Sequence, residues 1–174
     1  HLEDNLFVFA PNLADEAFYA GHAFTYIRRD QPDHAIYTLF SLLASHMSRQ
    51  TLTTFEHRSW GRARVWELTP WAMGYYTRLM ANLLCNDDGP DEQELVYCAA
   101  TPRAWLDPGK SIQIEGLQTR FGPTSFVLEA EASQITGTID LPQRFLPRTA
   151  RLRLRVNGAV TSVKFNGSPA AIDD

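Results

Sequence analysis

Apolar side chains recur at helical spacing along the first half of the chain. Three segments, 13–29, 31–47 and 69–84, carry them at steps of three and four residues, which is typical of one face of a helix. Asp30 is expected to cap the second helix, with Pro32 in its first turn. Because the link between the first two helices is so short, they should form an antiparallel hairpin.

From Glu94 onward the hydrophobic period changes to two, which is typical of half-buried strands. The expected strands are 94–99, 111–117, 124–132, 134–141, 149–156 and 160–166. Asn157-Gly158 separates the last two and is a strong signal for a tight hairpin. Several short strands joined by turns predict an antiparallel β-sandwich.

The change of period predicts an α+β chain of two domains: a helical segment over residues 1–92 and a β-sandwich over residues 93–174. The charge distribution agrees with that division. Residues 1–100 hold 7 basic and 13 acidic side chains, whereas residues 101–174 hold 9 and 7. We interpret this asymmetry as a domain signal rather than as the mark of a charged partner.

Composition excludes several function classes. A net charge of −4 gives no basic field for nucleic acid, and no apolar run reaches the length of a membrane span. The spacing of His and Cys matches no metal site, and neither a glycine-rich phosphate loop nor a serine-nucleophile elbow occurs. No cofactor is expected. Cys85 and Cys98 could pair or stay free, so they leave the compartment open.

The helical half carries more aromatic side chains than three helices bury. One interpretation is a mixed core with surface tyrosines. The favoured one is that these helices pack against further helices outside this chain, which starts at His1 rather than at Met. The expected partner is therefore an upstream part of the same protein, or a second chain that completes the helical domain.

Residues 49–61 are the best candidate for chemistry. There Glu56 stands beside an imidazole and a guanidinium, His57 and Arg58, with Trp60 close by. Carboxylates and guanidiniums bind sugar hydroxyls, aromatic rings stack on sugar C–H faces, and a carboxylate supplies the acid or base of a glycosidase. The alternative is a solvated connector in which Glu56 and Arg58 make salt bridges and Trp60 covers the helices.

Other polar residues have more ordinary explanations. Glu67 is the only other acid near the aromatic cluster and is the second candidate for a carboxylate role. His22 and His46 are expected to be polar residues on helix faces rather than catalysts. The arginines at 151, 153 and 155 are expected to form a solvated strand face rather than a polyanion site.

Two motifs carry a resemblance to a known family. Thr53-Thr54-Phe55-Glu56 matches the core of a late-loop motif, Gly-Ala-Thr-Thr-x-Trp-Glu, and the segment 101–126 contains Pro-Arg-x-Trp-Leu, Gly-Lys and Thr-x-Phe-Gly-Pro. In these features the chain resembles the C-terminal end of six-hairpin glycosidases, with alpha-L-rhamnosidases and related glycoside hydrolase-like proteins the most similar. Phe55 stands where rhamnosidases carry tryptophan, and Gln50-Thr51-Leu52 replaces the glycine-alanine lead.

The resemblance implies that residues 1–92 are the last helices of an incomplete (α/α)6 barrel. It makes Glu56 either the general base of an inverting mechanism, whose general acid lies upstream, or a carboxylate that binds the sugar. The residues expected to bind a polysaccharide or oligosaccharide are His57, Arg58, Trp60, Glu67 and Trp71. The chain alone should be inactive. A secreted or periplasmic location is favoured over a cytoplasmic one.

Two alternatives to a hydrolase stay open. In the first, the sandwich is a non-catalytic module that binds carbohydrate or buttresses a partner. In the second, the chain is the tail of a polysaccharide lyase, because helical toroids followed by sandwiches occur there too.

Overall fold

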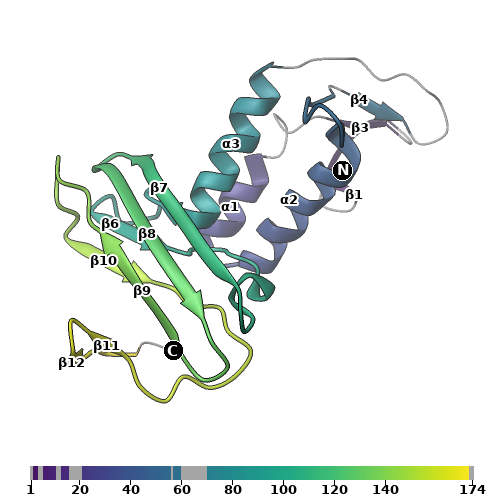
Figure 1. Ribbon diagram of the computed structural model, residues 1–174. Helices are drawn as coiled ribbons and strands as arrows, with labels where there is room; N and C mark the ends of the chain where they lie inside the picture. Colours follow the sequence, from purple (N-terminus) through teal and green to yellow (C-terminus); the bar gives the residue numbers. More distant parts are fainter. Residues whose placement is uncertain are drawn as a thin grey trace.

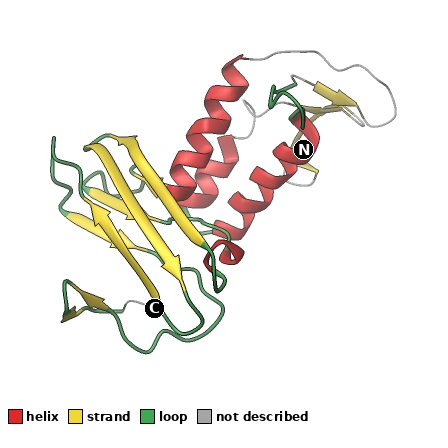
Figure 2. Ribbon diagram, viewed as in Figure 1, coloured by secondary structure: helices red, strands yellow, loops and turns green. Residues whose placement is uncertain are grey.

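The computed structural model of the chain describes residues 2–3, 6–10, 13–15, 21–55, 57–59 and 70–172. Figure 1 shows three helices: α1 (His22–Arg28), α2 (Pro32–His46) and α3 (Pro70–Leu84). They lie between a sheet of four short strands from residues 2–59, called the small sheet, and two three-stranded sheets formed after α3, which together hold more residues and are called the larger sheets (Figure 2). The chain is therefore α+β, with a helical part and a sheet part, as the change of hydrophobic period predicted.

The second and third expected helices are confirmed. Pro32 occupies the first turn of α2, where its missing N–H costs nothing, and the buried face of α2 holds Ala35, Thr38, Leu39, Leu42 and His46. α1, α2 and α3 bury one shared cluster of small and aliphatic side chains. Its helical members are Ala23, Ile27, Ala35, Leu39, Leu42, Ala72, Leu79 and Leu83.

The first expected helix is wrong over its first part. Leu13–Asp15 is a strand, β3, and α1 begins only at His22. The four strands of the small sheet are β1 (Leu2–Glu3), β2 (Leu6–Ala10), β3 and β4 (His57–Ser59), in that order. β3 pairs through its backbone with both β2 and β4. These partners stabilise it as a strand, and the spacing of its own apolar residues gives no sign of them.

Asp30 is not the helix cap that the sequence suggested. The residue before α2 is Gln31, which makes no side-chain capping bond, and Asp30 has a left-handed backbone with φ of 58°. Asparagine and aspartate tolerate this conformation better than most residues, and it turns the chain sharply between α1 and α2. The short hairpin of the two helices is confirmed, with α1 and α2 in contact.

The second half forms two three-stranded sheets. One has the order β10-β6-β5 and the other the order β7-β8-β9. The bounds are β5 (Cys85–Asn86), β6 (Glu94–Tyr97), β7 (Ser111–Thr119), β8 (Gly122–Ala130), β9 (Ile135–Asp140) and β10 (Thr149–Leu152). A 3-10 helix (Arg103–Leu106) precedes β7. Four of the expected strands thus exist with similar bounds, β10 is shorter than the expected 149–156, and only two residues of the expected strand 160–166 are in a strand.

The expected hairpin at Asn157-Gly158 is wrong. β10 pairs with β6 instead, in parallel, so the two larger sheets are not wholly antiparallel. The tight turn occurs at Asn166-Gly167, between β11 (Lys164–Phe165) and β12 (Ser168–Pro169). Both turn residues have positive φ, 50° and 81°, as the type I′ turn preferred by Asn-Gly requires.

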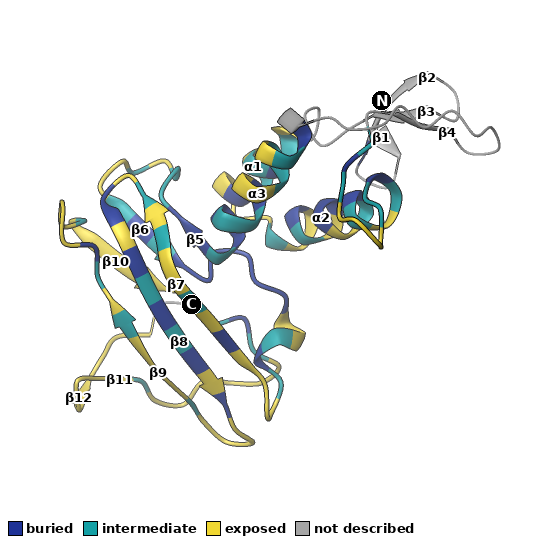
Figure 3. Cartoon of the chain, turned by 45° about the horizontal axis from the view of Figure 1, so that its top comes forward, coloured by how far each residue is buried: buried dark blue, intermediate teal, exposed yellow. Residues whose placement is uncertain are grey.

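The two larger sheets share one apolar core. β8 alternates buried and more exposed residues along its length (Figure 3), and its inward Phe126 packs edge-on against Tyr97 of β6, with ring centroids 5.5 Å apart. The buried Tyr97 hydroxyl lies 2.7 Å from Thr124 Oγ1, which donates to the Asp140 carbonyl. Since the threonine proton is used in that bond, the Tyr97 hydroxyl is the donor to Thr124 Oγ1. This hydrogen bond joins β6 of one sheet to β8 of the other.

Two of the three arginines expected to form a solvated face instead join the sheet part to the helices, whereas Arg151 is 56% exposed and pairs with Glu94 of the neighbouring strand β6. Arg153 pairs with Asp30, and Arg155, which is buried, lies 2.5 Å from Asp33. Arg155 also donates to the Thr101 carbonyl at 3.2 Å. The prediction failed because the alternation of arginine and apolar residues along a strand shows that one face is charged, but it does not show which acidic residues of other elements pack against that face. We call these pairs, Asp30–Arg153 and Asp33–Arg155, the interdomain clamp.

The interdomain clamp should weaken in acid. Hydrogen bonds from Arg153 and Arg155 lower the pKa of Asp30 and of Asp33, respectively, below the ordinary value of 3.8. A carboxylate with a depressed pKa stabilises the fold above its unfolded pKa and loses that contribution as the pH falls. We expect the urea midpoint to drop more between mildly and strongly acidic pH in the wild type than in Asp33→Asn. Asp107→Asn is the control, because Asp107 has no ion pair among the described residues. If the urea midpoint falls equally with pH in the wild type and in Asp33→Asn, the Asp33–Arg155 pair does not stabilise the fold as proposed.

Candidate functional site

The segment that the sequence singled out begins with a hydrogen-bonded turn. Met47 and Thr54 form an isolated antiparallel bridge, and Ser48 N donates to the Thr53 carbonyl at 2.9 Å. Phe55 N donates to the carbonyl of His46, the last residue of α2, also at 2.9 Å. The chain therefore returns to the end of α2 immediately before Glu56. We call residues 47–55 the post-α2 turn.

Side chains inside the post-α2 turn hold its shape. Thr51 Oγ1 lies 2.8 Å from Thr53 Oγ1, and Leu52 N donates to the Ser48 carbonyl at 2.9 Å. Leu52 has φ of 56°, an unfavourable value for leucine, and 61% of its surface is exposed. The turn thus presents an apolar side chain to solvent at a point where the backbone is strained, a feature that the sequence did not reveal.

His46 and Thr54 form the buried base of this turn. Both are buried, and His46 Nδ1 lies 2.6 Å from Ser45 Oγ. Ser45 Oγ in turn donates to the Ser41 carbonyl one helical turn earlier. The sequence placed His46 on a polar helix face, which its burial contradicts. Its backbone carbonyl accepts the Phe55 N–H that closes the turn.

The structure describes only some of the predicted site residues. Glu56, Trp60 and Glu67 lie outside the described residues. His57 and Arg58 belong to β4, where they pair in register with Asp15 and Ala14 of β3. Trp71 lies in the first turn of α3. The side chains of His57, Arg58 and Trp71 are also outside the described part, so their assembly into one site stays a prediction.

What the described chain does settle is the backbone on each side of Glu56. Phe55 is hydrogen-bonded to the end of α2, and His57 is paired with β3. The segment 49–61 is therefore not a plain connector between two helices: it contains a closed turn followed by a strand. Only residues 62–69, outside the described part, separate it from α3 in the sequence.

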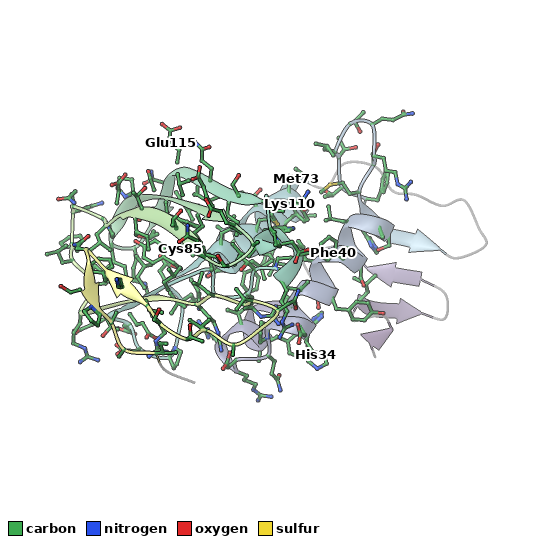
Figure 4. All side chains as sticks on the ribbon, turned by 60° about the horizontal axis from the view of Figure 1, so that its bottom comes forward. His34, Phe40, Met73, Cys85, Lys110 and Glu115 are labelled. Carbon is green, nitrogen blue, oxygen red and sulfur yellow. The ribbon has the colours of Figure 1, made fainter. Side chains whose placement is uncertain are left out.

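The outer face of the β7-β8-β9 sheet offers no aromatic platform. Its outward positions hold Ser111, Gln113, Glu115, Gln118, Pro123, Ser125, Val127, Glu129, Thr136, Thr138 and Asp140. Figure 4 shows Glu115 projecting from this face. Sugar rings bind most readily where an aromatic side chain covers their C–H face. All these positions are described, so this face lacks the feature that a glycan-binding surface of that kind needs.

The two cysteines are free thiols within the core of the larger sheets. Burial raises the pKa of each thiol to about 12, so neither forms the reactive thiolate at neutral pH. Among the described residues no group of His, Cys, Asp and Glu is arranged to hold a metal ion. In the same part of the chain, no helix combines the length and apolarity needed to cross a membrane.

The thiol pKa values lead to a labelling prediction. Cys85 and Cys98 are expected to stay unmodified by iodoacetamide in the folded protein at mildly alkaline pH, and to react fully once urea unfolds it. Mass spectrometry of the labelled chain measures this directly. Ser111→Cys, at an exposed position, should react in the native state and serves as the positive control. Rapid native labelling of the wild type would show that the core opens locally.

Comparison with protein-family models, with curated proteins and with solved structures finds no match to this chain.

Proposed function

We propose that this chain is the C-terminal part of a glycoside hydrolase of the (α/α)6-barrel type, in which Glu56 is the general base. The observation that carries the proposal is the post-α2 turn. It ends in Thr54-Phe55, it is closed by hydrogen bonds to Ser48 and His46, and it directly precedes the one carboxylate of the Thr-Thr-Phe-Glu motif. A catalytic base needs a backbone held on both sides in this way, because small misplacements are costly.

The proposed chemistry is inversion at the anomeric carbon. Glu56 would take a proton from a water molecule while a second carboxyl group, from an upstream part of the barrel, protonates the leaving oxygen. His57, Arg58 and Trp60 would line the sugar subsite, with Glu67 and Trp71 beside them. Since the two carboxyl groups come from different parts of the enzyme, the chain alone should not turn over.

The exposed stripe of α2 supports the proposal that more helices belong to this domain. Tyr37 and Phe40 lie one turn apart on α2 and remain 49% and 45% exposed. Figure 4 shows Phe40 on the helical part. In a six-hairpin barrel such a stripe packs against a neighbouring hairpin. The shared core of the two larger sheets likewise supports the description of the second part as a β-sandwich.

A structural role for the sheet part is the second candidate, and the interdomain clamp favours it. Arg153 and Arg155 fix the sheets to the helical hairpin through Asp30 and Asp33, which suits a domain that buttresses a barrel. Glycan binding by the outer face of β7-β8-β9 is disfavoured by its lack of aromatic side chains. The tail of a polysaccharide lyase remains the third candidate, with the same architecture and a different bond-breaking step.

Product analysis with the complete protein separates these candidates. A panel of aryl glycosides and plant or microbial polysaccharides is incubated with the protein, and both reducing ends and ultraviolet absorbance are followed. New reducing ends without absorbance support hydrolysis, whereas an absorbing unsaturated product identifies a lyase. If neither appears over the whole panel, the hydrolase proposal fails and the structural role stands.

A further inference from the structure

Three guanidiniums from three different elements surround the carboxylate of Asp88. Arg28 Nη2, from the end of α1, lies 2.6 Å from Asp88 Oδ1. Arg78 Nη2, from α3, lies 3.3 Å from Oδ2, and Arg120 Nη2, from the turn between β7 and β8, lies 3.6 Å from Oδ1. We call Arg28, Arg78 and Arg120 the Asp88 arginine cluster. It combines residues from the helical part and from the sheets.

Most of the hydrogen-bonding capacity of this cluster is unused by the described residues. A guanidinium has five N–H donors, of which Arg28 uses two, Arg78 one and Arg120 one. The side chains are also open to solvent, with exposed fractions of 53%, 62% and 36%, respectively. An incoming oxyanion can therefore reach donors from all three arginines.

Each guanidinium is held in place by a contact other than its ion pair. Arg28 Nε donates to the Asp88 carbonyl at 2.8 Å. Arg78 lies over the ring of Phe24, with its Cζ 5.3 Å from the centroid, and Arg120 Nη1 reaches the Glu92 carbonyl at 3.4 Å. Because the three guanidiniums are already held in place, a ligand that binds them loses less side-chain entropy.

The charge around Asp88 is also unbalanced. Among the described residues the carboxylate that the three guanidiniums contact is that of Asp88, whereas Asp87 accepts only the Arg120 backbone N–H, at 2.5 Å. Asp91, the next acid along the chain, pairs with Arg148 instead. Three guanidiniums therefore contact one carboxylate, and this excess of cationic groups at the contact favours a further anion.

We propose that the Asp88 arginine cluster is a binding site for a small oxyanion: a sulfate, phosphate or carboxylate group held by Arg28, Arg78 and Arg120. Guanidiniums bind such groups through paired, charge-assisted hydrogen bonds. The site lies away from the post-α2 turn. Arg28 lies at the start of the α1–α2 turn, and the post-α2 turn follows the far end of a 15-residue helix, about 22 Å away along its axis. The inference therefore stands whether or not the chain belongs to a hydrolase.

A titration followed by NMR of the arginine Nε–Hε groups tests this site. Sodium sulfate is added to the chain at constant ionic strength, with chloride as the replaced anion. The expected result is saturable shifts of Arg28, Arg78 and Arg120 with one common dissociation constant. Arg78→Gln should weaken sulfate binding about tenfold, as expected for the loss of one charge-assisted hydrogen bond. The matched control is Arg103→Gln, an exposed arginine that pairs with Asp33 instead, which should leave the affinity unchanged.

A second variant separates an anion site from a purely structural ion-pair network. Asp88→Asn removes the carboxylate that competes for the three guanidiniums, so sulfate should bind several-fold more tightly to it than to the wild type. Parallel titrations with phosphate and with galacturonate, against neutral galactose, distinguish an inorganic or phosphoester group from a sugar carboxylate. Shifts that do not saturate, or that persist unchanged in Arg78→Gln, mean an adventitious ion only and overturn the proposal.

Discussion

Replacing Glu56 by glutamine in the complete enzyme that we propose is expected to lower kcat by about 10²–10⁴-fold, the usual contribution of a general base. Glutamine keeps the size of the side chain and one hydrogen-bond acceptor, but it cannot take a proton from water. KM should therefore change little, because the loss falls on the transition state rather than on ground-state binding. Steady-state kinetics on the glycoside identified by product analysis measures both quantities.

The pH profile and a matched variant make this prediction specific. The acidic limb of kcat/KM reports the ionisation of the base, so it should disappear in Glu56→Gln and persist in Glu67→Gln. Glu67 is the other carboxylate considered for the site, and its replacement should act mainly on KM. Near wild-type turnover in Glu56→Gln would remove Glu56 from the mechanism, even if the protein proved to be a hydrolase.

Replacing Gly137 by alanine is expected to destabilise the sheet part by about 3 kcal/mol, at the upper end for overpacking. A Cβ on Gly137 would lie 2.1 Å from the Val127 carbonyl oxygen and 2.8 Å from Leu128 Cδ2. Because the first of these atoms is backbone in the central strand, relief requires β8 and β9 to separate. The melting temperature should fall by roughly 10 °C, as measured by circular dichroism.

Gly74→Ala is the control for the glycine substitution. Gly74 lies inside α3, and a Cβ added there would meet no atom within 4 Å. Alanine loses less backbone entropy than glycine in a helix, so this variant should gain about 0.5–1 kcal/mol. Equal stability of the two variants would mean that β8 and β9 are not as closely paired at Gly137 as their register indicates.

The spacing of apolar residues predicted where helices and strands occur better than it predicted which strands pair with each other. The periods of three to four and of two located α2, α3 and most strands, because each element buries one face. The hairpin failed because Asn-Gly occurs twice, at 157–158 and at 166–167, and only the second joins paired strands. The partner of β10 is β6, more than fifty residues earlier, and such distant pairing leaves no local signal.

The sequence indicated a candidate site, and the assembly of its residues stays a prediction. A carboxylate among aromatic and cationic residues indicated the segment 49–61, and the Thr-Thr-Phe-Glu motif narrowed it to Glu56. Neither β4 nor the strain at Leu52 could be foreseen, since β4 depends on pairing with β3, a strand near the start of the chain. The Asp88 arginine cluster was missed for the same reason: Arg28, Arg78 and Arg120 are far apart in sequence and form no motif.

The parallel pairing of β10 with β6 has a consequence for the synthesis of the protein. A ribosome releases the helices and β6 well before residues 149–155 emerge, so a nascent chain lacks both the outer strand of that sheet and the arginines that pair with Asp30 and Asp33. Domains usually begin folding from their N-terminal end during translation. Here one set of contacts between the two parts is completed only when residues 149–155 emerge. A chain that ends before Thr149 would keep the Asp33–Arg103 and Arg28–Asp88 pairs but would lack the outer strand β10 and the pairs of Asp30 and Asp33 with Arg153 and Arg155.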